Sequence, residues 1–215
     1  MINKDTKLYG SFSQKAGSKG CEFFNKEFAR HNLNSIYKSF SVNSIKNAVE
    51  AAITLKMSGF AISMPYKKEV LSHCDELSSC AKEIGAANTV INRFGNLTAH
   101  NTDYLAVIKL LSDYPLSGVN DIFVLGNGGY SAAVKFAIKN NFIKLKIFTV
   151  TRENWKELNK LRNKLIFNCT PVANIGVHHS NLFIDCLISS KTGLFLSKAQ
   201  ASYQFKLYTG INIIK

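Results

Sequence analysis

The stretch Ile122-Phe123-Val124-Leu125-Gly126-Asn127-Gly128-Gly129-Tyr130-Ser131 decides the fold of the second half of this 215-residue chain. Its four apolar residues predict a short buried strand, and the glycines predict a tight turn into a helix that runs to about Lys139. Further strand patterns at 145–150 and 165–167 flank a helical pattern at 153–161. Strands that alternate with helices at this spacing predict a parallel sheet.

The first half of the chain also mixes helices and strands. Its predicted elements are a helix that stops at Gly59, a buried strand, a hairpin and a second helix, over 45–57, 60–63, 89–99 and 104–111. The linker-like stretch 114–118 separates this half from the parallel-sheet half. We therefore predict an α/β chain with two domains that divide near 104–118.

The end of the chain predicts one more helix, over about 195–208. Apolar residues recur there at near-helical spacing, which predicts an amphipathic helix. They are Phe195, Leu196, Ala199, Tyr203 and Leu207.

Composition excludes several classes of protein. Hydrophobic residues make up 46% of the chain and charged ones 19%, which excludes disorder because a core can form. No run approaches about 18 uncharged apolar residues, so we expect no membrane span. No apolar leader is visible, and the five cysteines form no CxxC pair. We therefore expect a reduced, cytoplasmic protein without metal ligands.

The net charge of +13 is uneven along the chain. Residues 1–104 carry 13 basic and 9 acidic residues, and residues 105–215 carry 14 and 5. Such an excess favours nucleic acid, a membrane surface or small anions as partners. The basic residues are mostly single lysines, without an aromatic-basic strip, so we predict neither nucleic acid nor a membrane as partner. A solvated lysine-rich surface is the alternative explanation.

The glycine loop Gly126-Asn127-Gly128-Gly129 indicates a cofactor site. Small residues let the backbone approach a pyrophosphate, and the helix N-terminus supplies free N–H groups. The match to G-x-G-x-x-G is imperfect, because Ser131 occupies the third glycine position. Arg152 ends the next predicted strand, where an arginine favours NADP(H) over NAD(H). A simple tight turn and a solvent-exposed arginine are the alternatives.

Polar residues in the first half stand where apolar segments end. Lys67 follows the buried strand, and Asn88 and Asp103 flank the hairpin. A lysine and an aspartate that converge there form a workable proton-transfer pair, because the carboxylate orients an ammonium that exchanges a proton with a hydroxyl. Taken separately, Asp103 would be a helix N-cap, Asn88 a turn residue and Lys67 a surface lysine.

Seven motifs in order resemble the shikimate dehydrogenase family, and residues 1–40 and 101–104 are most similar to its bacterial shikimate dehydrogenase-like branch. The motifs are Ser63-Met64-Pro65-Tyr66-Lys67, Gly85-Ala86-Ala87-Asn88-Thr89, Asn101-Thr102-Asp103, Gly126-Asn127-Gly128-Gly129, Thr151-Arg152-Glu153, Asn168-Cys169-Thr170-Pro171 and Ala199-Gln200-Ala201. The resemblance implies an N-terminal α/β substrate domain over 1–104 and a reduced Rossmann-like parallel-sheet cofactor domain over 105–193. It also implies that the helix 194–209 packs back on the substrate domain.

The resemblance implies roles for particular residues. Lys67 and Asp103 match the catalytic pair, and the substrate contacts match Ser18, Ser63, Asn88 and Gln200. The NADP contacts match Gly126, Asn127, Gly128, Gly129, Arg152 and Thr170. The implied reaction is the reversible NADP-dependent oxidation of shikimate to its 3-dehydro form, in the chorismate pathway of aromatic amino acid biosynthesis.

Several positions depart from the family pattern. Gly20 replaces the second serine of the carboxylate-binding loop that aligns with 18–25, and Ala61 replaces an asparagine. Phe195 stands where glycine is common, and the segment between Pro171 and Thr192 is short. We therefore carry two hypotheses: an NADP-dependent dehydrogenase of shikimate or a related hydroxylated cyclic carboxylate, and a reduced, non-catalytic relative that binds a small anion or partner. Either would be a monomer or a homodimer.

Overall fold

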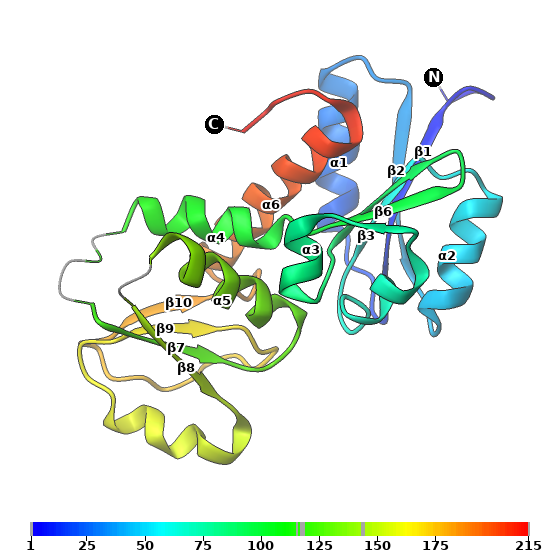
Figure 1. Cartoon of the computed structure of the whole chain (residues 1–215). Coiled ribbons are helices and arrows are strands. Elements are labelled where there is room, and N and C mark those ends of the chain that lie inside the picture. The colour runs from blue at the N-terminus through cyan, green and yellow to red at the C-terminus, as the bar shows by residue number, and fades with distance from the viewer. Residues whose placement is uncertain (1, 115, 117–118, 143–144, 215) are drawn as a thin grey trace. The chain divides into compact units, whose positions relative to one another are not determined.

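A computed structural model describes residues 2–114, 116, 119–142 and 145–214 (Figure 1). The chain forms two compact units: unit 1 comprises 1–102 and 201–215, and unit 2 comprises 103–200. The predicted linker 114–118 includes Pro115, Ser117 and Gly118, which lie outside the described residues. Helix α6 (Lys191–Thr209) contributes to both units, because the division falls between Gln200 and Ala201.

Unit 1 is built on a six-stranded mixed sheet with the strand order β2-β1-β3-β5-β6-β4. Its strands are β1 (Lys7–Ser13), β2 (Ser35–Ser41), β3 (Gly59–Ile62), β4 (Glu76–Leu77), β5 (Thr89–Arg93) and β6 (Asn96–His100). Its helical segments are α1 (Lys19–Arg30), α2 (Ile45–Thr54), η1 (Glu69–His73) and α3 (Ser79–Ile84). Strands β5 and β6 form the predicted hairpin, with Val90 opposite Ala99. Helix α2 ends at Thr54, and Gly59 begins β3 instead of stopping the helix.

Two apolar clusters cover the two faces of this sheet. Helix α2 packs on one face through Ile45, Val49 and Ala52, which are buried with Phe12 and Phe60. Side chains alternate across a strand, so Tyr9 points to the other face. There an aromatic cluster joins α1, β1, β2 and the end of α6 through Phe24, Phe28, Tyr9, Tyr37 and Phe205. The last turns of α6 are therefore part of the core of unit 1.

Unit 2 contains a four-stranded parallel sheet with the order β10-β9-β7-β8. Its elements are α4 (Asp103–Ser112), β7 (Asp121–Leu125), α5 (Gly129–Asn141), β8 (Lys146–Val150), η2 (Arg152–Lys160), β9 (Leu165–Asn168), β10 (Leu182–Asp185) and the first part of α6. Helices α4 and α5 pack on one face of the sheet over Ile122, Val124 and Phe167. The other face carries a smaller cluster under η2 that includes Leu125 and Leu158.

Two predicted helices differ from those observed. The segment predicted as a helix over 153–161 is a 3₁₀ segment, with non-helical backbone at Asn154. The apolar face predicted for the last helix is also wrong in its second half. Leu207 is exposed, whereas Gln204 and Phe205 are buried. Because α6 packs against different partners in units 1 and 2, one stripe of constant spacing does not describe its buried side. Among the described residues, no helix is long and apolar enough to cross a membrane.

Candidate functional site

Three predicted site residues lie at one edge of the unit 1 sheet. Ser63 directly follows β3 and is exposed. The carbonyl of Asn88, just before β5, accepts the N–H of Ile62 at 2.8 Å. The segment that follows β3 and the segment that precedes β5 are also joined there, because the carbonyl of Lys67 accepts the N–H of Ala87 at 2.7 Å. Unit 1 therefore brings Ser63, Lys67 and Asn88 to the edge where β3 ends and β5 begins.

Several hydrogen bonds hold the side chain of Asn88. Its side chain is buried, and Oδ1 accepts the N–H of Thr102 and the hydroxyl of Thr89, both at 2.8 Å. Nδ2 donates to the hydroxyl of Thr102 at 2.9 Å. A backbone N–H can only donate, so Thr102 fixes which end of the amide carries the oxygen. The side chain of Asn88 therefore has one orientation.

Ser18 lies at the N-terminus of α1, where its hydroxyl donates to Oε1 of Glu22 at 2.9 Å. This hydrogen bond, together with Lys19, lowers the pKa of the Glu22 carboxyl. The Ser18 hydroxyl must break its hydrogen bond to Glu22 before it can donate to a bound anion. The negative charge of Glu22 also repels such an anion. The residues that align with the family's carboxylate-binding loop lie mostly in helix α1, which begins at Lys19.

In unit 2, β7 leads directly through the glycine loop into α5, as the sequence predicts. Gly126 has φ +96°, and a Cβ added there would lie 3.1 Å from Cγ2 of Thr170. Gly128 is the N-cap of α5, and a Cβ added there would meet nothing within 4 Å. Open backbone at the start of a helix of this length fits an anionic group such as a pyrophosphate.

Gly126→Ala should lower the free energy of unfolding by about 1–3 kcal/mol, because an alanine is strained at this positive φ and crowds Thr170. Gly128→Ala is the matched control. Its φ of −86° suits any residue, so the cost should stay well below that of Gly126→Ala. Urea unfolding of both variants measures the difference. Equal destabilisation would contradict this account of the loop.

Asn168 holds the Thr170 loop beside Gly126. This buried side chain accepts the N–H and hydroxyl of Thr170 at 3.0 and 2.7 Å. It donates to Oδ1 of Asp185 at 3.0 Å and to the carbonyl of Val172 at 2.9 Å. Asn168 stands in the motif Asn168-Cys169-Thr170-Pro171, but no role was predicted for it. The sequence signal for a role of Asn168 is its position as a polar residue at the end of the apolar strand β9.

Asp103 is the first residue of α4 and is buried. Removal from water raises the pKa of Tyr130 and of Cys169, and the charge of Asp103 adds to both effects. The Asp103 carboxylate therefore lies near the residues that border the glycine loop in unit 2. The Cys169 thiol stays protonated at neutral pH, which excludes a thiolate nucleophile beside this loop.

The other predicted residues of unit 2 lie at or near its surface. Arg152 is exposed and begins η2, directly after β8 and Thr151. Asn127 is exposed, and its Oδ1 accepts from Lys135 at 3.4 Å. Gln200 is half-buried and donates to the carbonyl of Ser197 at 3.0 Å. Among the described residues, no group of three or more His, Cys, Asp or Glu could hold a metal ion.

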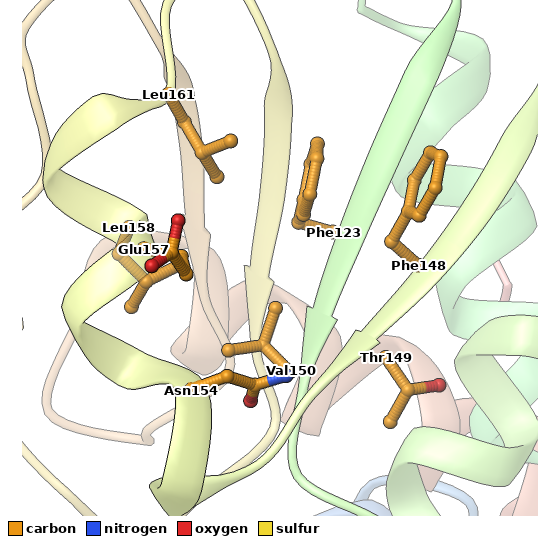
Figure 2. Close-up of a pocket in the computed structure, with 8 residues that line it drawn as sticks. All are labelled: Phe123, Phe148, Thr149, Val150, Asn154, Glu157, Leu158 and Leu161. Carbon is orange, nitrogen blue, oxygen red and sulfur yellow. The ribbon is translucent and has the colours of Figure 1, made fainter.

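A cavity of about 210 Å³ lies between η2 and the β7–β8 pair (Figure 2). Its lining residues are Phe123, Phe148, Thr149, Val150, Asn154, Glu157, Leu158 and Leu161. The rings of Phe123 and Phe148 stack with centroids 5.0 Å apart. The lining contains no predicted site residue, and its one charged group is a carboxylate. The cavity is therefore no candidate for a phosphate-bearing ligand.

One buried polar residue of unit 1, Gln204, was not predicted from the sequence. Gln204 of α6 donates to the carbonyl of Asn88 and to the hydroxyl of Thr89, both at 2.9 Å. It lies one turn beyond Gln200, and this i, i+4 spacing was the only signal in the sequence. Gln204 therefore joins the network that holds Asn88.

The fold defines an α/β protein of two units, the second of which has a Rossmann-like parallel sheet. Comparison with known families narrows this class. Residues 15–90 match the shikimate dehydrogenase substrate binding domain, so this part of the chain belongs to that domain family. The resemblance and the fold class predicted from the sequence are both confirmed.

Curated relatives match part of the chain. A shikimate dehydrogenase-like protein from Haemophilus influenzae is 40% identical over 149 residues, which are 69% of this chain and 55% of that protein. A shikimate dehydrogenase (NADP(+)) from Pyrococcus furiosus is 32% identical over 162 residues, or 74% of this chain and 59% of that protein. The matched part thus spans little more than half the length of these relatives.

A solved structure has the same fold. The shikimate dehydrogenase of Aquifex aeolicus superposes with a TM-score of 0.85 at 26% identity, over 99% of this chain and 96% of that chain.

Proposed function

We propose that this chain is an NADP-dependent oxidoreductase that interconverts shikimate, or a related hydroxylated cyclic carboxylate, and its 3-dehydro form. The observation that carries the proposal is the open glycine loop before α5, beside Thr170, in a chain whose residues 15–90 match the shikimate dehydrogenase substrate binding domain. Several relatives, including those from Pyrococcus furiosus and Aquifex aeolicus, are named shikimate dehydrogenase (NADP(+)). The proposal places the protein in the cytoplasm and in the synthesis of aromatic amino acids.

The residues of unit 2 fit an NADP molecule. Backbone N–H groups at Gly128 and Gly129 would hold the pyrophosphate, with Gly126 and Asn127 forming the turn. Arg152 would pair with the 2′-phosphate, because a guanidinium matches the geometry of phosphate oxygens. Thr170 would lie beside the nicotinamide. When bound, the cofactor supplies the hydride chemistry.

Lys67 and Asp103 are the proposed catalytic pair. Lys67 would exchange the proton of the hydroxyl that is oxidised, and Asp103 would keep its ammonium oriented. Lys67 belongs to unit 1 and Asp103 is the first residue of unit 2. Asp103 directly follows Thr102 in the sequence, and the N–H of Thr102 binds Asn88 within unit 1.

Asn88, Ser63, Ser18 and Gln200 are the proposed substrate contacts. Asn88 is held in one orientation, as a group that must recognise one hydroxyl requires. Ser18 would reach the substrate carboxylate only after it releases Glu22.

Gln200→Ala should raise the KM for the hydroxy acid by about 2–100-fold, because one or two hydrogen bonds to a substrate are worth roughly 0.5–3 kcal/mol. The affinity for NADP should not change. Lys191→Ala, an exposed position on the same helix, is the control. Steady-state kinetics and calorimetry measure both quantities, and an unchanged KM would remove Gln200 from the site.

A reduced, non-catalytic relative that binds a small anion or partner is the second candidate. The unit 2 sheet favours it, because the described residues form four strands where the common dinucleotide-binding arrangement has six. Gly20 and Ala61, which replace polar residues of the family pattern, favour it as well.

Purified protein distinguishes the two candidates. We expect NADP⁺ to be reduced when shikimate is added, and NAD⁺ to react much more weakly. Quinate tests the substrate class, and fluorescence titration with NADPH separates binding from turnover. NADPH binding without turnover of either acid would favour the non-catalytic relative.

A further inference from the structure

Thr170 lies where the order of the strands reverses in the sheet of unit 2. Strand β8 lies on one side of β7, whereas β9 and β10 follow on the other side. In open parallel sheets, ligands bind outside the carboxyl ends of the strands at such a reversal. Leu125 and Asn168 are paired at the carboxyl ends of β7 and β9, and Thr170 follows two residues after Asn168. Thr170 therefore belongs to the edge at which sheets of this topology bind ligands.

The hydrogen bonds around the Thr170 side chain have determined directions. The N–H of Thr170 donates to the Asn168 amide at 3.0 Å, so the atom of Asn168 that faces it is Oδ1. The opposite end of the amide agrees, because Nδ2 lies 2.9 Å from the carbonyl of Val172, which can only accept. The hydroxyl of Thr170 lies 2.7 Å from Oδ1. Since an amide oxygen can only accept, this hydroxyl must donate its hydrogen to Asn168.

The Thr170 hydroxyl can therefore offer a further partner only a lone pair. A hydroxyl has one donor hydrogen and two acceptor lone pairs. The hydrogen is directed to Asn168, whose side chain is 1% exposed, and one lone pair accepts the N–H of Val172 at 3.3 Å. Any other group that forms a hydrogen bond with this hydroxyl must consequently be a donor.

We propose that Thr170 binds the ligand of this site as a hydrogen-bond acceptor, and that it thereby selects a group that carries N–H. The carboxamide of a nicotinamide is such a group, because its nitrogen has two N–H donors. A ligand with only an acetyl or a carboxylate group in that place is disfavoured, because its oxygen would meet a lone pair of Thr170. This inference rests on the proposed function for its cofactor and adds the atom that recognises it.

A cofactor analogue tests this selectivity through binding alone. The 3-acetylpyridine analogue of NADP⁺ keeps the carbonyl but has a methyl group in place of the amide nitrogen, so it has no N–H to donate at that position. We expect the wild-type protein to bind NADP⁺ about 3–10-fold more tightly than this analogue, which is the effect of one hydrogen bond. Calorimetric titration measures both dissociation constants. Equal affinities would overturn this inference and leave the proposed function intact.

Thr170→Val removes the hydroxyl and retains a methyl group beside Gly126. We expect the preference for NADP⁺ over the analogue to fall below about twofold in this variant, because the acceptor is absent. Thr170→Ser retains the hydroxyl and should retain the preference. Thr149→Val, at an exposed position on β8, is the matched control and should behave as the wild type. A preference that persists unchanged in Thr170→Val would overturn the proposal.

NMR of the ligand-free protein separates failure of this inference from failure of the proposed function. The side-chain amide signals of Asn168 should shift in Thr170→Val, because Oδ1 loses one of its two donors. The same signals should stay unchanged in Thr149→Val. Signals that do not shift in Thr170→Val overturn the arrangement of donors and the inference with it. A shift in a protein that does not bind NADP⁺ supports the acceptor role of Thr170 and removes only NADP as its partner.

Discussion

Lys67→Ala should lower kcat about 10²–10⁴-fold, with NADP binding nearly intact, because the reaction loses the group that exchanges the hydroxyl proton. Asp103→Asn should cause a loss of similar size, since the neutral amide no longer orients an ammonium. The pair should also be strongly non-additive. A double variant that is scarcely slower than either single variant is the expected sign of two residues acting as one unit.

Lys68→Ala provides the control for this prediction. Lys68 is exposed, follows Lys67 directly and carries the same charge, so loss of a positive charge alone would affect both positions. Stopped-flow measurement of cofactor reduction, with NADP binding measured in parallel, gives both quantities. Turnover that persists unchanged in Lys67→Ala would end its assignment as the catalytic residue.

Arg152→Ala should weaken NADP binding by about 10–100-fold and leave NAD binding almost unchanged. A charged, bidentate pair with the 2′-phosphate contributes roughly 1.5–3 kcal/mol, and NAD lacks that phosphate. Arg152 is exposed at the start of η2, where its side chain can reach a ligand without rearrangement of the core.

Lys156→Ala removes an exposed positive charge from the same 3₁₀ segment and should leave the preference for NADP intact. Calorimetric titration of both variants with NADP and NAD measures the preference directly. An equal loss of affinity for both cofactors in Arg152→Ala would show that the arginine does not read the 2′-phosphate.

Sequence patterns predicted those strands, turns and helices whose structure is determined by residues adjacent in the chain. The stretch from Ile122 to Ser131 gives a strand, a positive-φ glycine and a helix, as predicted from four apolar residues followed by glycines. The hairpin over 89–99 was also predicted, because the β-branched run Thr89-Val90-Ile91 and the run Leu97-Thr98-Ala99 flank a short turn that contains Gly95. Both are determined within about ten residues, so no tertiary information is needed.

The parts that were missed depend on contacts distant in sequence. Nothing near Gln204 shows that it is buried, because its partners Asn88 and Thr89 lie more than a hundred residues earlier. Phe205 and Leu207 are similar in apolar character, yet only Phe205 meets the core of unit 1. Strand β10 (Leu182–Asp185) was also missed, although it is as long as β3 and β9, which were predicted.

Some features of the candidate site depend on adjacent residues, and others depend on contacts that are distant in sequence. Lys67, Asn88 and Asp103 could be named because each follows or precedes an apolar segment. The hydrogen bonds that orient Asn88 could not be predicted, since they need the register of β5 against β3 and β6. The hydrogen bond between Ser18 and the Glu22 carboxylate was not predicted either. It forms because the start of α1 brings these two residues one helical turn apart.

Transfer of hydrogen from substrate to cofactor tests the central claim most directly. Shikimate labelled with deuterium at the carbon that is oxidised is incubated with NADP⁺ and the purified chain, and the cofactor is recovered for mass spectrometry. We expect reduced cofactor that carries one deuterium, in an amount equal to the 3-dehydro product, and formed about 10²–10⁴ times more slowly with Lys67→Ala. Recovery of unlabelled, fully oxidised cofactor after prolonged incubation with wild-type protein would contradict the claim that this chain is a shikimate oxidoreductase.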